Sequence, residues 1–130
     1  MSLERDILSS VKTIAVVGLS SDPMKPSYEV SEYMQRQGYR IIPVNPKETE
    51  VLGEKAYATL EEIPEPVDLV NVFRRPAKTP EVVRSAVAIG AKSVWLQLGI
   101  ANEEARAIAE QAGLTFVQDR CLLIEHRRTR

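Results

Sequence analysis

Cysteine and histidine are nearly absent from this sequence of 130 residues, which contains one of each. A single cysteine excludes an internal disulfide and any zinc site that needs several cysteines. The single histidine, His126, lies close to the end of the chain and leaves little basis for a metal centre or a catalytic triad. We therefore expect no metal site, and we assign no catalytic residue.

Long apolar runs and an excess of one charge sign are also missing. No stretch approaches the roughly 20 apolar residues that cross a bilayer, and the charged start lacks the apolar region of a signal peptide. Lys+Arg 17 against Asp+Glu 18 gives a net charge of −1, which disfavours nucleic acid as a partner. We expect a single globular domain in the cytoplasm, with no membrane or nucleic-acid partner.

Short apolar runs alternate with helical patterns along the chain. Continuous apolar runs of this kind are typical of parallel strands buried on both faces. The predicted strands are 13–17, 41–44, 68–73, 93–96 and 115–117. The predicted helices are 3–11, Ser27 (as N-cap) to Gly38, Thr79 (as N-cap) to Gly90, and Asn102 to Gly113, with one or two helical turns at 59–63 in the less regular segment 48–67.

This alternation predicts an α/β fold with an open, five-stranded parallel sheet in one domain, 1–130. We expect its core at about 13–121, preceded by a leading helix within 1–12 and followed by a basic tail, 122–130. In such sheets ligands bind at the carboxyl ends of the strands. The loops that leave those ends are therefore the candidate site.

Cations outnumber acids in these loops, although the whole chain is nearly neutral. The cations are Lys25, Lys47, Arg74, Arg75, Lys78 and Arg120, and the acids are Asp22 and Asp119. A positive rim at the ligand edge of the sheet favours a polyanionic small molecule over a neutral one.

The first loop indicates where an anion binds. Gly18 directly after a buried strand permits a tight turn, and the loop leads to a helix start at Ser27. Backbone N–H groups at a helix start bind anions, and the side chains of Ser20, Ser21 and Lys25 add donors and charge. The dinucleotide fingerprint G-x-G-x-x-G is not met, because serine and proline stand at its second and third glycine positions.

The second loop, Asn45-Pro46-Lys47, lacks the acid that accepts the ribose hydroxyls of NAD. A lysine at this position suits a phosphorylated ribose instead. NADP and coenzyme A (CoA) both stay open at this point.

A family resemblance runs through about residues 13–121. It is carried, in order, by VVGLSSDP (16–23), KPS (25–27), GY (38–39), IPVNP (42–46), LG (52–53), VDLVNVFR (67–74), IGAK (89–92), WLQLG (95–99) and DRC (119–121). As a set, these segments resemble the CoA-binding domain family, in particular the stand-alone proteins similar to the N-terminal domain of the succinyl-CoA synthetase α-subunit. The resemblance implies a Rossmann-like sheet with helices on both faces that binds CoA along its carboxyl edge.

The resemblance also implies a role for each part of the edge. Gly18, Ser20, Ser21 and Lys25 would hold the pyrophosphate, and Asn45, Pro46 and Lys47 would flank the adenosine end. Val72, Phe73, Arg74 and Pro76 would line the path of the pantetheine arm, with Gln97 and Gly99 near its far end.

The synthetase uses a phosphorylated histidine in a later domain, which this sequence lacks. We therefore expect binding of CoA or an acyl-CoA without catalysis, and we favour a packing role for Cys121 over thiol chemistry. The alternatives are an NADP-dependent oxidoreductase fragment and a CoA-responsive regulatory protein that binds a protein partner. The sequence does not identify such a partner.

Overall fold

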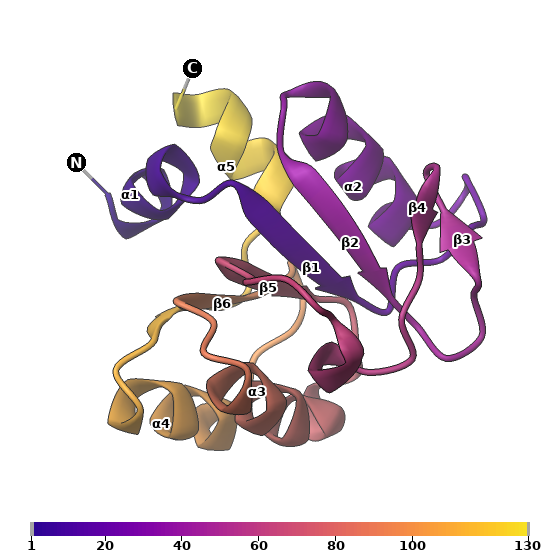
Figure 1. Ribbon diagram of the computed structural model, residues 1–130. Helices are drawn as coiled ribbons and strands as arrows, with labels where there is room; N and C mark the ends of the chain where they lie inside the picture. Colours follow the sequence, from indigo (N-terminus) through magenta and orange to yellow (C-terminus); the bar gives the residue numbers. More distant parts are fainter. Residues whose placement is uncertain (1, 130) are drawn as a thin grey trace.

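The computed structural model describes residues 2–129. Its main sheet is parallel throughout, with the strand order β2-β1-β5-β6-β7 (Figure 1). The strands are β1 (Thr13–Val17), β2 (Arg40–Val44), β5 (Leu69–Val72), β6 (Ser93–Leu96) and β7 (Thr115–Val117). The predicted fold class, an open five-stranded parallel sheet of Rossmann-like type with helices on both faces, is confirmed.

Helices cover both faces of the sheet (Figure 1). One layer holds α1 (Leu3–Ser10), α2 (Pro26–Arg36) and α5 (Leu122–Thr129), and the other holds α3 (Thr79–Ala88) and α4 (Glu103–Gln111). Two short 3₁₀ turns, η1 (Leu60–Glu62) and η2 (Pro76–Lys78), and a small antiparallel hairpin of β3 (Glu50–Val51) and β4 (Glu54–Lys55) complete the chain.

The core consists of two apolar clusters, one on each face of the sheet. Successive strand residues point to opposite faces, so Ala15 packs toward α3 and α4 while Ile14 and Val16 pack toward α1, α2 and α5. Trp95 is fully buried in the second cluster and donates from Nε1 to the carbonyl oxygen of Arg120, 2.8 Å away. Burial on both faces explains why the strands read as continuous apolar runs.

Two helices begin earlier than their predicted caps imply, α3 by one residue and α2 by two. Thr79 is the first residue of α3 and Lys78 is its N-cap, because the η2 turn runs directly into the helix. Ser27 lies inside the first turn of α2, which begins at Pro26. A proline at the first helical position needs no N–H donor, so the helix starts there without a side-chain cap.

The segments before and after the predicted core pack against the sheet more extensively than the sequence indicates. Ile7 and Leu8 of α1 are buried in the second cluster, and 122–129, expected as a basic tail, forms α5 with Leu122 buried. Residue 130 of that segment lies outside the described residues. Among residues 2–129, no helix combines the length and apolarity that a bilayer crossing requires.

The amino edge of the sheet is fixed by one carboxylate. Asp68 Oδ2 accepts hydrogen bonds from the backbone N–H groups of Lys12 at 2.9 Å and Thr13 at 3.1 Å. Burial alone raises the pKa of this carboxyl, but the two N–H donors and the nearby ammonium of Lys92 outweigh it and hold the pKa below its ordinary value of 3.8.

Candidate functional site

The strand order creates a crevice at the carboxyl edge of the sheet. β1 lies between β2 and β5, and the chain leaves β1 toward α2 on one face but leaves β5 toward α3 on the other (Figure 1). This divergence is the topological switch point at which open α/β sheets bind their ligands. The site is therefore expected between the loops that follow β1, β2 and β5.

Gly18 lets the loop after β1 pass very close to the loop after β5. Its φ is +91°, and its N–H donates to the carbonyl oxygen of Val44 at 2.8 Å. A Cβ built on Gly18 would collide with the backbone carbonyl oxygen of Phe73. The N–H of Phe73 donates to the carbonyl oxygen of Val17 at 2.9 Å, which fixes the two loops at this separation. Only glycine meets both the positive φ and the close approach.

A cavity of about 350 Å³ opens at this edge. It is lined by Val17, Gly18, Val44, Asn45, Pro46, Lys47, Ala58, Phe73 and Arg74. A smaller cavity of about 140 Å³ adjoins it and shares Val17, Val44, Ala58 and Arg74. Together they form one groove across the ends of β2, β1 and β5.

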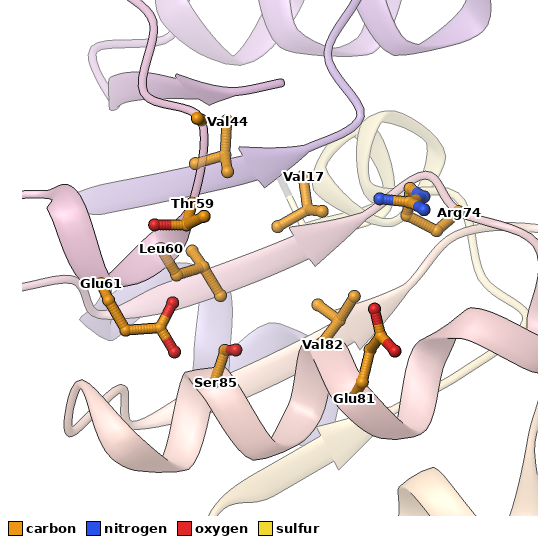
Figure 2. Close-up of a pocket in the computed structure, with 10 residues that line it drawn as sticks. Val17, Val44, Thr59, Leu60, Glu61, Arg74, Glu81, Val82 and Ser85 are labelled. Carbon is orange, nitrogen blue, oxygen red and sulfur yellow. The ribbon is translucent and has the colours of Figure 1, made fainter. Parts of the chain in front are cut away.

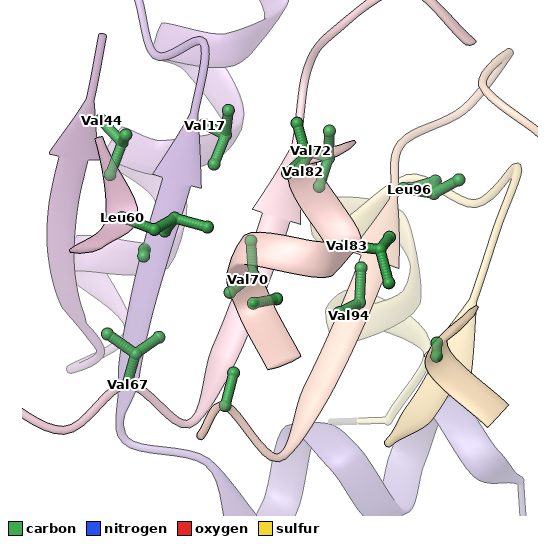
Figure 3. Packing of buried hydrophobic residues seen from close by; sticks show 14 of the residues in the cluster. Val17, Val44, Leu60, Val67, Val70, Val72, Val82, Val83, Val94 and Leu96 are labelled. Carbon is green, nitrogen blue, oxygen red and sulfur yellow. The ribbon is translucent and has the colours of Figure 1, made fainter. Parts of the chain in front are cut away.

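The smaller cavity has an apolar wall and a polar mouth (Figure 2). Val17, Leu60 and Val82 face one another across it, from β1, η1 and α3. These residues belong to the buried cluster between the sheet and α3, so the core itself supplies the floor of the groove (Figure 3). The mouth carries the side chains of Thr59, Glu61, Arg74, Glu81 and Ser85.

Most backbone N–H groups of the loop after β1 already have acceptors. Ser20 N–H donates to Ser27 Oγ at 3.1 Å, and Asp22 N–H donates to Ser20 Oγ at 3.0 Å. Met24 N–H donates to Asp22 Oδ1 at 2.9 Å, and Ser21 N–H donates to the carboxylate of Glu48 at 2.9 Å. The loop is thus a pre-ordered structure rather than an open row of donors.

Asn45 joins the loop after β2 to the loop after β1. Its Nδ2 donates to the carbonyl oxygen of Leu19 at 3.1 Å, and its Oδ1 accepts from the N–H of Lys47 at 3.0 Å. The side chain is half-buried, and both ends of its amide are in use. Asn45 therefore shapes the groove as well as lining it.

The cations of the rim predicted from the sequence make no ion pair with any residue in 2–129. They are Lys25, Lys47, Arg74, Arg75, Lys78 and Arg120. The ion pairs that do form involve Arg36, Arg40, Arg84, Lys92, Arg106 and Arg128 instead. Two of the six, Lys47 and Arg74, line the larger cavity, so the cavity carries positive charge that no acid among residues 2–129 neutralises by an ion pair.

The structure gathers part of the predicted set around the larger cavity. Gly18, Asn45, Pro46, Lys47, Phe73 and Arg74 line it. Ser20, Ser21 and Lys25 lie in the adjoining loop, Val72 is buried in β5, and Pro76 begins η2.

Gln97 and Gly99 lie beyond β6, and neither lines the groove. Gln97 is buried, and its Oε1 accepts from the N–H of Leu122 at 3.0 Å, which caps α5. Gly99 N–H donates to Asp119 Oδ1 at 2.7 Å. Both residues thus hold the neighbouring loops in place.

Sequence reasoning missed the wall that Ala58, Thr59 and Leu60 supply. This segment reaches the groove because Tyr57 pairs with the outer edge of β2: its N–H donates to Pro43 at 3.0 Å, and its carbonyl accepts from Asn45 at 2.9 Å. One signal was available, since Thr59 and Glu62 form a capping box around η1. No group of three or more potential metal ligands occurs among the described residues, 2–129.

Known proteins share both this sequence and this fold. The chain matches the CoA binding domain family over residues 12–127. It is 45% identical over 122 residues to the Bacillus subtilis protein YneT, covering 94% of this chain and 90% of YneT. It is 46% identical over 68 residues to the ADP-forming acetate–CoA ligase II subunit alpha of Pyrococcus furiosus, covering 52% of this chain but 15% of that subunit.

Solved structures resemble the chain over nearly its whole length. A protein from Pyrococcus horikoshii superposes with a TM-score of 0.95 at 40% identity, covering 99% of this chain and 92% of that one. A Thermus thermophilus protein superposes with a TM-score of 0.94 at 41% identity, covering 100% of both chains.

Proposed function

The chain belongs to the CoA-binding domain family, and on this premise we propose that it binds CoA or an acyl-CoA in the groove at the carboxyl edge of its sheet. One observation carries the proposal. Lys47 and Arg74 line the larger cavity at the switch point, and neither makes an ion pair with a residue in 2–129. Unpaired positive charge around a partly apolar groove suits a ligand with several phosphates and a long uncharged arm.

The proposed pose assigns the ligand's groups by their chemistry. The pyrophosphate lies beside Gly18, Ser20, Ser21 and Lys25, and the phosphorylated ribose lies beside Lys47. The pantetheine arm follows Phe73 and Arg74 toward Pro76. The known ligases that match the chain carry CoA in their names, and the chain is homologous to a part of them.

Calorimetric titration tests this proposal directly. CoA should release heat and bind with a stoichiometry of one, and dephospho-CoA should bind more weakly because it lacks the 3′-phosphate that Lys47 faces in the proposed pose. Added salt should weaken both interactions, because exposed charges are screened within about 10 Å at 0.1 M salt.

NADPH serves as the comparison ligand, since it too carries a phosphorylated ribose. Binding of NADPH without binding of CoA would assign the groove to a nicotinamide cofactor and overturn the proposal. The absence of heat with CoA at millimolar concentration would overturn it as well.

A further inference from the structure

A carboxylate already occupies donors that the proposed ligand needs. Glu48 Oε2 accepts the backbone N–H of Ser21 at 2.9 Å and the Ser21 hydroxyl at 3.0 Å. Ser21 is in the loop after β1, which the proposed function assigns to the pyrophosphate, and Glu48 comes from the loop after β2. The one oxygen atom thus bridges the two loops that frame the groove.

Glu48 differs from the other acceptors in the loop after β1. Ser20, Asp22 and Ser27 belong to that loop or to the helix that follows it, so their hydrogen bonds set its local shape. Glu48 is 27 residues further along the chain and carries a full charge. Carboxylate and phosphate oxygens bind the same kind of donor through charge-assisted hydrogen bonds, so the two compete for it.

The charges around Glu48 do not hold it in place. Within residues 2–129 it makes no ion pair, although Lys47 is its neighbour in sequence. A phosphate bound at Ser21 would lie next to this carboxylate, and two like charges at contact distance repel each other at this exposed position, most of all at low salt. A phosphate that took these donors would therefore have to displace the Glu48 side chain.

We propose that Glu48 acts as an internal anion, which holds the loop after β1 in the empty protein and competes with the ligand's phosphate for Ser21. This inference rests on the proposed function. The competition sets a threshold for binding: the ligand must offer enough additional contacts along the groove to displace the carboxylate. Short anions such as inorganic pyrophosphate gain little by displacing it, whereas CoA gains the contacts of its whole length.

The test compares Glu48→Gln with Glu50→Gln. Glutamine at position 48 keeps an acceptor for Ser21 but removes the charge, so the loop stays tied. Glu50 is exposed in β3, two residues away, and its side chain makes no hydrogen bond or ion pair with the described residues, so its replacement removes the same charge without touching the loop. Calorimetry with CoA and with inorganic pyrophosphate is carried out on both variants and on the wild type at low salt.

For Glu48→Gln we expect CoA to bind about tenfold more tightly than to the wild type, which corresponds to about 1.4 kcal/mol. Pyrophosphate should also bind more tightly, and Glu50→Gln should leave both affinities within about twofold of the wild type. In the wild type, the backbone amide resonance of Ser21 should shift on addition of CoA as its acceptor changes from carboxylate to phosphate.

Other outcomes overturn this inference. Equal CoA binding by Glu48→Gln would show that Glu48 does not compete with the ligand, and weaker binding would make it a support of the bound state; either result leaves the proposed function intact. An equal gain in CoA affinity for Glu50→Gln would show that the gain comes from the change in net charge and not from the contact with Ser21. If CoA binds none of the three proteins while pyrophosphate still prefers Glu48→Gln, the internal anion stands and the proposed function falls. If neither ligand binds any of the three, both fall.

Discussion

Replacing Gly18 by alanine tests the close contact on which the groove depends. The change adds one methyl group at a residue with a φ of +91°, in a position where that methyl group overlaps the carbonyl oxygen of Phe73. The strained φ costs about 1–3 kcal/mol. Forcing a methyl group into a packed position costs about another 1–3 kcal/mol.

The sum predicts that Gly18→Ala lowers the free energy of unfolding by about 2–6 kcal/mol. For a chain of this size 1 kcal/mol shifts the melting temperature by about 4 °C, so the loss should be about 8 °C or more. Because the methyl group separates the loops after β1 and β5, CoA affinity should also fall by at least about tenfold.

Gly38→Ala is the matched control. Gly38 has a φ of +101°, but a Cβ there would meet nothing within 4 Å. Gly38→Ala therefore carries the backbone penalty alone, about 1–3 kcal/mol as at Gly18. Urea unfolding of both variants separates the two contributions. Equal losses of stability in Gly18→Ala and Gly38→Ala would show that the two loops do not approach as closely as the structure places them.

Three further predictions concern the ligand edge, the amino edge and α5. Lys47→Ala should abolish most of the preference for CoA over dephospho-CoA in calorimetry, and an unchanged ratio would exclude Lys47 as the partner of the 3′-phosphate. Asp68→Asn should lower unfolding free energy by about 1–2 kcal/mol at pH 7, because it weakens two charge-assisted hydrogen bonds. The folded-state pKa of Asp68 lies below 3.8, so its stabilisation is present above that pH and is lost as the pH falls through the folded-state value; denaturant titrations should show wild type and variant converging as the pH falls below 3.8. Gln97→Ala should cost about 1–3 kcal/mol in urea unfolding, since it leaves the N–H of Leu122 without its acceptor at the start of α5; a smaller change would show that water replaces the amide.

The parallel sheet was predictable because its evidence is local and repeated. Each strand is an apolar run of three to five residues, and each is followed by turn or capping residues that any chain of this composition must place at the surface. The edge at which a ligand binds then follows from the direction of the strands alone. This is why Gly18, Asn45 and Arg74 could be assigned to one place before their contacts were known.

The rest of the groove depends on contacts that the sequence does not signal. Outside the two cavities, the turn between β3 and β4 likewise places Leu52 at a φ of +56°, a conformation that a bulky apolar residue seldom adopts and that no sequence rule assigns to leucine. Glu48 reads as one more charge in an irregular segment, and its role emerges only when the loops after β1 and β2 lie side by side. The capping role of Gln97 likewise depends on α5, and the sequence predicts a basic tail where α5 forms.

The outer edge of β2 links the fold to the shape of the groove. Pro43 cannot donate a hydrogen bond, which restricts this strand to the edge of the sheet. The carbonyl oxygen of Pro43 remains available and accepts a hydrogen bond from the N–H of Tyr57 at 3.0 Å. The segment that follows Tyr57 therefore folds over the carboxyl ends of the strands. That segment brings Ala58 and Leu60 against Val17, which closes the apolar side of the groove opposite α3. A sheet whose edge strand ended without this pairing would keep the cations of the rim but lose the wall that gives an uncharged ligand arm a surface to bury against.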